Sequence, residues 1–276
     1  MIDIDYSDGI MIKTHNLNAV FTKHQLPLKI EIKNSFNNTI WDTKLESHMW
    51  ASYPSNELKD VVIRDNEDNY VTRYYWDVLK NGTIFHKTLW LYCRSISNSG
   101  RLPYGIVIGT HDGEFGEWVP VIKGNLSEIL LIEGSTQQFI TLSKNYNNKP
   151  GIKLLNEIVT PNGGKVEFFE GGRGYTNSVI ERVIKNWETE EIKSTWRVSK
   201  DINTIMNYEN KIVDWLHLDL EGLDAQIIKG IKLPLPPFII FEDYNLTPDE
   251  KEDINHYLSS LRFNLYSESG ITMATK

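Results

Sequence analysis

Tyr104-Gly105-Ile106-Val107-Ile108-Gly109-Thr110-His111-Asp112-Gly113 is the stretch that decides the fold. An apolar run ends there in a turn with two glycines, and a second apolar run, residues 129–132, ends at Glu133. Glycine is needed where a strand bends sharply, and an acidic residue about 20 positions later is typical of a group that binds a ribose. The pattern predicts the first β-α-β unit of a doubly wound sheet, with a ligand at its crevice.

The turn differs from the turn that binds a dinucleotide. That motif has a second glycine two residues after the first, so that the main chain can approach a pyrophosphate, and this chain has His111 there. The histidine ring, with Asp112 and Glu114 beside it, would crowd and repel a diphosphate. An adenosine cofactor with a cationic sulfur would tolerate the acids. We therefore predict S-adenosylmethionine rather than NAD.

The composition is that of a folded globular protein. The chain has 276 residues, of which 40% are hydrophobic and 24% charged, which is enough for a large core. A net charge of -8 argues against a nucleic-acid partner, because such binding relies on clustered lysine and arginine. Cys93 is the single cysteine, and neither a signal peptide nor a membrane-spanning run is evident. We expect a cytoplasmic protein without a membrane span.

Hydrophobic periodicity predicts two parts. Residues 1–82 contain alternating runs at 26–33 and 39–45 and a hairpin across 61–71, which predict a β-rich extension. Residues 83–276 begin with a helix to about 95 and then alternate strands with helices, which predicts a Rossmann-like, doubly wound, mostly parallel α/β sheet of six to seven strands. The candidate ranges for these strands are 105–109, 129–133, 153–159, 191–199, 213–220, 238–243, and an edge pair at 263–266 and 271–274. The expected helices are 116–123, 136–146, 199–208, 223–229 and 247–261, with loops at 163–164 and 170–175.

A second motif, Leu218-Asp219-Leu220-Glu221-Gly222-Leu223-Asp224, follows a later apolar run. Ligands of open α/β sheets bind outside the carboxyl ends of the strands, so Asp219 and Glu221 are candidate cofactor, metal or base groups. The alternative is that Glu221 and Asp224 only cap the next helix, whose dipole favours acids.

Four segments, 108–113, 131–135, 216–224 and 238–242, occur in the order and approximate spacing of FkbM-like methyltransferases. The chain resembles that family over about residues 96–276, and Asp219-Leu220-Glu221-Gly222 is the most specific segment. The resemblance implies a class I S-adenosylmethionine-dependent methyltransferase that modifies a hydroxyl of a sugar, glycan or related natural product. The chain departs from the family pattern at Val107, where an acidic residue is common, and at His217, where lysine is common.

The resemblance also implies a cofactor site at the ends of neighbouring strands. The methionine part would lie among Gly109, Thr110, His111, Asp112 and Gly113. The ribose would bind Glu133, the adenosine would border Gly134 and Ser135, and Asp219 would face the reactive methyl. By position in a class I fold, Asn156 and Glu157 are further candidates for the adenine edge.

Methylation of a hydroxyl requires an aligned acceptor and a group that takes its proton. Asp219 is the first candidate for the base, with His217 and Glu242 as alternatives. His111 could also act as base, although packing is the more ordinary role of such a histidine. A divalent cation could be held by Asp219, Glu242 and Asp243, but no metal is expected, since the sequence lacks a diagnostic ligand set.

The expected partner is a small-molecule or glycan acceptor, and a homo-oligomer stays open. Aromatic residues of the extension more ordinarily form a small core, but we hypothesise that they form a lid or acceptor platform, with a wall completed from a glycine-rich loop. These residues are Trp41, Trp50, Tyr53, Tyr70, Tyr74, Tyr75 and Trp76 in the extension, and Arg173, Tyr175 and Asn177 in the loop. Two other functions remain open. One is an NAD-dependent oxidoreductase, which His111 disfavours; the other is a noncatalytic sugar-binding or assembly protein with a degenerate cofactor pocket, suggested by Val107.

Overall fold

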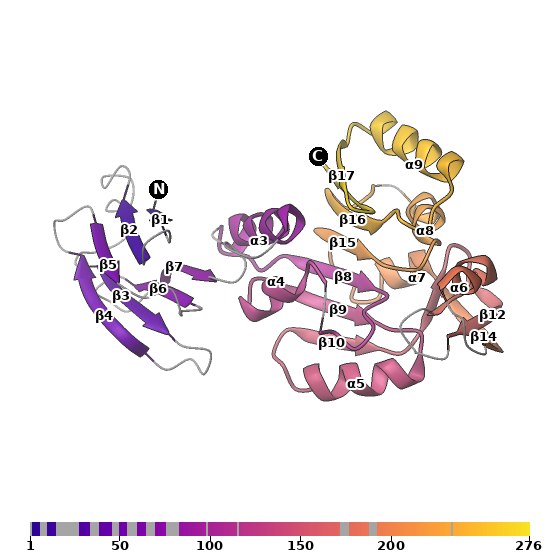
Figure 1. The fold of residues 1–276 in the computed structure, drawn as a ribbon, viewed down its shortest axis with the longest axis horizontal. Coiled ribbons are helices and arrows are strands. Elements are labelled where there is room, and N and C mark those ends of the chain that lie inside the picture. Colours follow the sequence, from indigo (N-terminus) through magenta and orange to yellow (C-terminus); the bar gives the residue numbers. More distant parts are fainter. Residues whose placement is uncertain are drawn as a thin grey trace. The chain divides into compact units, whose positions relative to one another are not determined.

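The computed structural model describes residues 2–5, 10–14, 28–33, 39–45, 50–53, 60–64, 70–75, 83–97, 99–114, 116–171, 177–187, 192–232 and 234–276. The chain divides into two compact units, Met1–Lys87 and Thr88–Lys276. Figure 1 shows the strands and helices of both units. The division falls within the helix α3 (Ile84–Ser97).

The first unit consists of two antiparallel sheets, so the predicted β-rich character of residues 1–82 is confirmed. One sheet has the order β1-β2-β5 and the other β4-β3-β6-β7. Their strands are β1 (Ile2–Asp5), β2 (Ile10–Thr14), β3 (Leu28–Lys33), β4 (Thr39–Leu45), β5 (Trp50–Tyr53), β6 (Asp60–Arg64) and β7 (Tyr70–Tyr75). The structure describes no side chain of residues 1–82, and Arg173 and Tyr175 lie outside the described residues, so the aromatic platform stays a prediction.

The second unit is built on a seven-stranded sheet with the order β10-β9-β8-β15-β16-β18-β17. The strands from β10 to β16 are parallel, and β18 is antiparallel to both of its neighbours. Their bounds are β8 (Tyr104–Ile108), β9 (Glu128–Ile132), β10 (Ile152–Leu155), β15 (Trp215–Leu218), β16 (Phe238–Glu242), β17 (Asn264–Glu268) and β18 (Ile271–Thr275). The predicted fold class, a Rossmann-like and mostly parallel sheet of seven strands, is confirmed.

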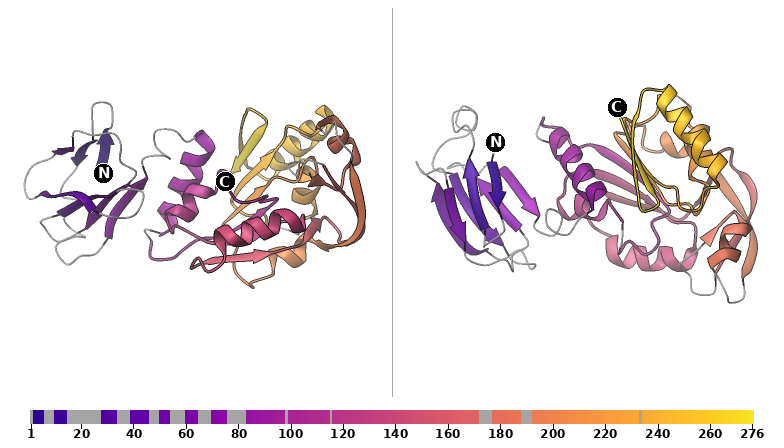
Figure 2. Two further views of the ribbon diagram at one scale, coloured as in Figure 1. Left: turned by 60° about the horizontal axis from the view of Figure 1, so that its bottom comes forward. Right: turned by 45° about the horizontal axis from the view of Figure 1, so that its top comes forward.

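Helices cover both faces of this sheet, as doubly wound folds require. Figures 1 and 2 show α5 (Thr136–Tyr146) and α9 (Pro248–Ser260) on opposite faces. Alternate residues such as Ile108, Leu218 and Phe241 join the main hydrophobic core with α7 (Ile202–Met206), α8 (Asp224–Gly230) and α9. On the other face Phe238 contacts Tyr92 of α3, with ring centroids 4.8 Å apart. The remaining helices are α4 (Val119–Lys123) and α6 (Glu181–Trp187).

A second sheet lies within the same unit and was predicted incorrectly. The run 191–199 is not part of the central sheet, because β14 (Lys193–Asp201) pairs with β11 (Ile158–Thr160) and β12 (Gly164–Glu170), and β12 pairs with β13 (Asn177–Ser178). The expected strand 153–159 is therefore two strands in two sheets, interrupted at Asn156. The expected loops at 163–164 and 170–175 overlap the ends of β12, which includes Gly164 and Glu170, and residues 172–175 lie outside the described residues. The short alternating pattern of this strand gives little sequence signal.

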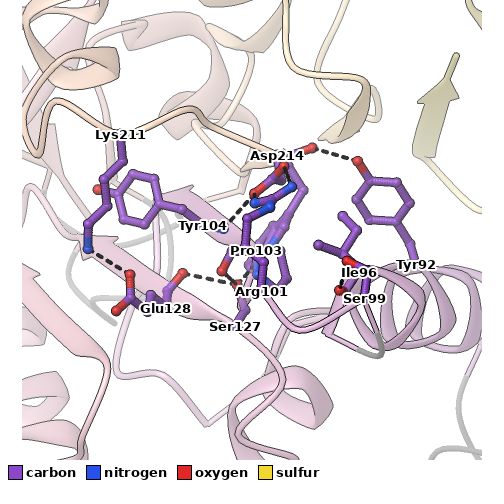
Figure 3. Close-up of polar contacts among 11 residues, drawn as sticks. Tyr92, Ile96, Ser99, Arg101, Pro103, Tyr104, Ser127, Glu128, Lys211 and Asp214 are labelled. Atoms are coloured by element: carbon purple, nitrogen blue, oxygen red, sulfur yellow. Dashed lines mark hydrogen bonds and ion pairs between the residues drawn. The ribbon is translucent and has the colours of Figure 1, made fainter. Parts of the chain in front are cut away.

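Asp214 ties together the two central strands at the end opposite the candidate site (Figure 3). Its buried carboxylate accepts two hydrogen bonds from the Arg101 guanidinium, at 2.6 and 2.9 Å, and one from the Tyr104 backbone N–H at 2.8 Å. The Tyr92 hydroxyl donates to the Asp214 carbonyl at 3.2 Å. This residue therefore links the start of β15 to the start of β8 and to α3.

Asp214→Asn is expected to lower the free energy of unfolding by about 1–3 kcal/mol, the usual cost of losing hydrogen bonds to a buried charged group. The amide nitrogen of asparagine cannot accept the hydrogen bonds that one carboxylate oxygen accepts now. Urea unfolding measures the change. Asp253→Asn is the matched control, because the Asp253 carboxylate pairs on the surface with Lys229 at 2.5 Å and exposed pairs contribute little. Equal losses for the two variants would contradict the assignment.

Candidate cofactor and acceptor site

The turn after β8 requires glycine because neighbouring atoms leave no room for a side chain. Gly109 has a φ of +84°, and a Cβ built on it would lie 1.8 Å from the carbonyl oxygen of Asp219. The ends of β8 and β15 meet here, since the Asp219 N–H donates to the Ile108 carbonyl at 3.0 Å. Gly113, with a φ of +79°, similarly leaves no room for a Cβ against the ring of Tyr146. Both glycines are thus explained by contacts within the protein.

Glu133 holds this turn in place. One oxygen of its buried carboxylate accepts a hydrogen bond from the backbone N–H of His111 and the other from that of Ser135, both at 2.7 Å. His111 has a φ of +51°, an unusual conformation for a residue with a side chain, and the bond to Glu133 supports it. Burial raises the pKa of Glu133 to about 7, against the opposing effect of the two N–H donors. A carboxylate has about four lone-pair sites, so further donors can still bind.

Two cavities open at the carboxyl ends of the central strands. The narrower one, about 70 Å³, is lined on one side by Gly109, Glu133 and Gly134 and on the other by residues of the second sheet. The wider one, about 310 Å³, lies beside the turn residues 109–112 and the ends of β15 and β16. Gly109, His111 and Asp219 line both cavities and so separate them. Asp219 is exposed to solvent there.

The structure brings most of the predicted residues to these cavities. The cavity walls include Gly109, Thr110, His111, Asp112, Glu133, Gly134, Glu157, His217, Asp219 and Glu242. Three predicted cofactor residues line neither cavity: Gly113, Ser135 and Asn156. These residues contact the cavity-lining segments instead. The Asn156 amide, for example, donates to the Glu133 carbonyl at 2.7 Å and to the Gly134 carbonyl at 3.4 Å.

The second sheet supplies a wall that the sequence did not predict. Ile158 and Val159 of β11, Phe168 of β12 and the segment 177–179 line the narrower cavity. In Figure 1, β12 and β14 lie beyond the arrowheads of β8 and β9. Arg197 of β14 anchors this sheet to the segment after β9, since its guanidinium donates to the Gly134 carbonyl at 2.8 Å. Asn177, predicted as part of a wall, does line this cavity.

His217 forms a buried pair with Glu117, a residue that sequence reasoning missed. His217 Nε2 and Glu117 Oε2 are 2.7 Å apart, and the residues are 5% and 9% exposed. His217 Nδ1 is buried and has no hydrogen-bond partner among the described residues. Both side chains line the wider cavity. Glu117 belongs to no motif, and only the path of the chain between Gly113 and α4 brings it to β15.

Four carboxyl groups surround the end of β15. The Asn245 amide bridges two of them, donating to Glu221 at 2.7 Å and to Glu242 at 3.2 Å. Burial, together with the charges of Glu242, Asp219 and Asp224, raises the pKa of Glu221 to about 9. Burial and the charge of Asp219 raise the pKa of Glu242 to about 7, and the same two causes raise that of Asp224. Asp219 is therefore the common neighbour of the cluster.

Asp219 itself is accessible through the cavities, although protein atoms crowd it on most sides. This crowding raises the pKa of its carboxyl, an effect that His217 and His111 oppose and Glu117 increases. Asp224 is not an exposed helix cap, because it is buried and accepts from the Leu220 backbone N–H at 3.3 Å. Asp243 points to other partners: it pairs with Lys251 at 3.0 Å and accepts from the Thr272 hydroxyl at 2.5 Å.

The cavities have few positive charges and no metal-binding constellation. No lysine or arginine lines either cavity in the part of the chain that the structure describes. Among the described residues, no group of three or more histidine, cysteine, aspartate or glutamate side chains is arranged to hold a metal ion. The described helices also include none that is long and apolar enough to cross a membrane.

No protein-family model matches the chain, and no curated protein sequence matches it. Several solved structures are similar in fold. Precorrin-6y C5,15-methyltransferase from Geobacter metallireducens has 12% identity and a TM-score of 0.35, covering 66% of this chain and 86% of that one. Fibrillarin from Aeropyrum pernix, with natively bound S-adenosyl-L-methionine, has 9% identity and a TM-score of 0.36, covering 79% and 93%.

The N-terminal domain of human METTL16 in complex with SAH is also similar, with 11% identity, a TM-score of 0.39, and coverage of 69% and 70%. These neighbours include S-adenosylmethionine-dependent methyltransferases and cofactor complexes. At these identities the similarity is one of fold alone.

The carboxyl cluster predicts an unusual pH dependence of stability. The pKa values of Glu133, about 7, and Glu221, about 9, lie above the ordinary 4.5. Between the ordinary and the raised pKa the folded chain binds more protons than the unfolded chain, so these groups make stability fall as pH rises. Urea unfolding at pH 5, 7 and 9 is expected to show this fall.

Glu221→Gln is expected to make that fall smaller, because the amide has no proton to lose. Glu252→Gln is the control for removing one negative charge, since Glu252 lies on the exposed side of α9. Stability that rises from pH 5 to pH 9, or an equal effect of the two substitutions, would contradict the cluster's electrostatics.

Proposed function

We propose that the protein is an S-adenosylmethionine-dependent O-methyltransferase. The single observation that supports this most is the arrangement at the end of β8, where Glu133 supports the turn at Gly109 and His111 and Asp219 lies directly beside it. Carboxylates at both places suit a cofactor that has ribose hydroxyls and a cationic sulfur. The resemblance of segments 108–113, 131–135, 216–224 and 238–242 to FkbM-like methyltransferases supports the same function.

The geometry of the turn argues against a dinucleotide. Dinucleotide folds place the N-terminus of a helix directly after the glycine turn, where its N–H groups bind the pyrophosphate. Here the next helix, α4, begins only at Val119 and has five residues. Because carboxylates line the cavities and no lysine or arginine does among the described residues, a diphosphate would lack positive partners. An NAD-dependent oxidoreductase is therefore the poorer interpretation.

The chemistry of the narrower cavity fits an adenosine. Glu133 has acceptor capacity left for ribose hydroxyls, and Ile158, Val159 and Phe168 form an apolar wall for a base. Glu157 lines the same cavity and could accept from an adenine amine. At about 70 Å³ the cavity is smaller than a nucleoside, so binding would require the covering strands to shift outward. The turn residues and Asp219 would hold the methionine part.

S-adenosylmethionine supplies a methyl group on a sulfonium, whose carbon–sulfur bond breaks as the acceptor oxygen bonds to carbon and the electron pair goes to sulfur. The protein's task is to align the acceptor hydroxyl and to take its proton. Asp219 is proposed as the base, because it is accessible from both cavities. Crowding raises the pKa of this carboxyl, and a higher pKa makes its carboxylate a stronger base.

Val107 does not argue strongly for a degenerate cofactor pocket. It is fully buried in β8 and pairs in register with His217, so the two side chains share one face of the sheet. Glu117 reaches this face and bonds to His217. A carboxylate is therefore present next to the position where the family commonly has an acid, although it comes from a different part of the chain.

The acceptor is proposed to be a sugar, glycan or related hydroxylated natural product, which the resemblance implies. The β-rich first unit is proposed as a lid or acceptor-binding element. A cytoplasmic location is also proposed, and the oligomeric state is left open.

Glu133→Gln is expected to weaken S-adenosylmethionine binding by about 1–3 kcal/mol, because hydrogen bonds to a charged acceptor are lost. Isothermal titration calorimetry measures the affinity. Glu128→Gln is the matched control, because Glu128 lies at the opposite end of the same strand and bonds to Lys211 at 2.6 Å. Unchanged affinity in Glu133→Gln would refute the ribose assignment, and binding of NADH without binding of S-adenosylmethionine would refute the cofactor.

Asp219→Asn is expected to reduce turnover by about 10²–10⁴-fold, the contribution of a general base, while cofactor affinity changes only a few-fold. Transfer of a labelled methyl group to an acceptor found by screening measures this. Asp243→Asn is the control at the end of the adjacent strand, since its carboxylate is bonded to Lys251 and Thr272 and does not line the cavities. Retained turnover in Asp219→Asn would remove Asp219 from this role.

A further inference from the structure

Four carboxylates contribute to the wall of the wider cavity. Asp112, Glu117, Asp219 and Glu242 contribute carboxylates to its wall, and no lysine or arginine lines it among the described residues. Lys251, which follows β16 along the chain, pairs with Asp243 rather than lining this cavity. A phosphate or carboxylate placed in this cavity would lose its hydration without gaining a counter-charge.

His217 provides an independent sign of a ligand. The residue is 5% exposed, and its Nδ1 atom is buried and has no partner among the described residues. Nε2 lies 2.7 Å from the Glu117 carboxylate, and a carboxylate fixes the imidazole tautomer by accepting the N–H. Nδ1 is then a bare acceptor. Buried polar atoms are normally hydrogen-bonded, so this atom lacks a donor that a bound molecule would supply.

We infer that the wider cavity binds a hydroxylated acceptor that carries a protonated amine and no phosphate or carboxylate, with one of its hydroxyls donating to His217 Nδ1. Amino sugars have this chemistry. This inference deepens the proposed methyltransferase function and rests on it for the role of the cavity as the acceptor site. At about 310 Å³ the cavity is in the size range of small-molecule sites.

The inference is tested by nuclear magnetic resonance of the full chain labelled with ¹⁵N-histidine, with the His217 signals assigned by their loss in His217→Gln. Without ligand, His217 is expected to be the tautomer protonated at Nε2. The probes are glucosamine, glucose and glucose 6-phosphate. Glucosamine is expected to shift the Nδ1 signal and to bind about fivefold or more tightly than glucose, whereas glucose 6-phosphate is expected to leave the signal in place.

Three variants separate charge recognition from general effects. Glu242→Gln is expected to remove most of the preference for glucosamine over glucose, because it deletes a carboxylate of the cavity wall. Glu128→Gln, at the far end of β9, is expected to keep that preference. His256→Gln removes an exposed histidine of α9 and is expected to leave the titration unchanged.

Three outcomes would overturn the inference: no shift of His217 with glucosamine, equal affinity for glucosamine and glucose, or binding of glucose 6-phosphate as tight as that of glucosamine. A tautomer protonated at Nδ1 would overturn the role of that atom. Because these titrations contain no cofactor, their failure is distinct from failure of the proposed function, which calorimetry with S-adenosylmethionine tests separately.

Discussion

The close approach of two strand ends is the constraint on which the rest of the site depends. Gly109 lies so near the Asp219 carbonyl that no side chain fits between them, and the Asp219 N–H bonds to Ile108. This contact turns the chain after β8 away from the sheet and places the Asp219 carboxyl beside the turn. Glu133 then holds the turn from the neighbouring strand through the His111 N–H. Three strand ends thus converge on one point, where both cavities meet.

The electrostatics of this point follow from the topology. Parallel strands bring their carboxyl ends to the same edge, and here three of those ends carry the acids Glu133, Asp219 and Glu242. Burial raises the cost of ionising Glu133 and Glu242, and the charge of Asp219 adds to that cost. Such a cluster opposes folding at neutral pH unless a bound cation or hydrogen-bond donors offset it. Buried carboxylates that lower the stability of the fold are expected where they are needed for binding.

The second sheet determines what the narrower cavity can hold. Phe168 and Ile158 come from strands β12 and β11, which lie along the chain between β10 and β15 of the central sheet. Arg197 connects this insertion to the Gly134 carbonyl. The second sheet is therefore attached to the end of β9. The wall opposite Glu133 is therefore built by the second unit itself. The lid predicted for residues 1–82 is not needed to explain this wall.

Much of the site was predictable because local sequence carries its signals. Local patterns predicted the strands and the acids at their ends. These patterns are the apolar run before Gly109, the spacing to Glu133 and the segment Asp219-Leu220-Glu221-Gly222. The helix expected at 247–261 was also found, as α9, since helix starts depend on a few adjacent residues; in the structure Thr247 and Glu250 form a capping box there. Strand β14 was placed in the wrong sheet, because its pairing with β12 connects residues that no local pattern relates.

The sequence by itself determined the class of sheet and the acids at its carboxyl edge, because alternation and glycine spacing act over short distances along the chain. Only the tertiary structure decided that Glu117 pairs with His217, that Asn156 supports Glu133 rather than lining a cavity, and that Gly109 is required by the Asp219 backbone. The physical reason is that each of these contacts joins segments separated by at least 20 residues, and packing of the whole domain sets the distance between them.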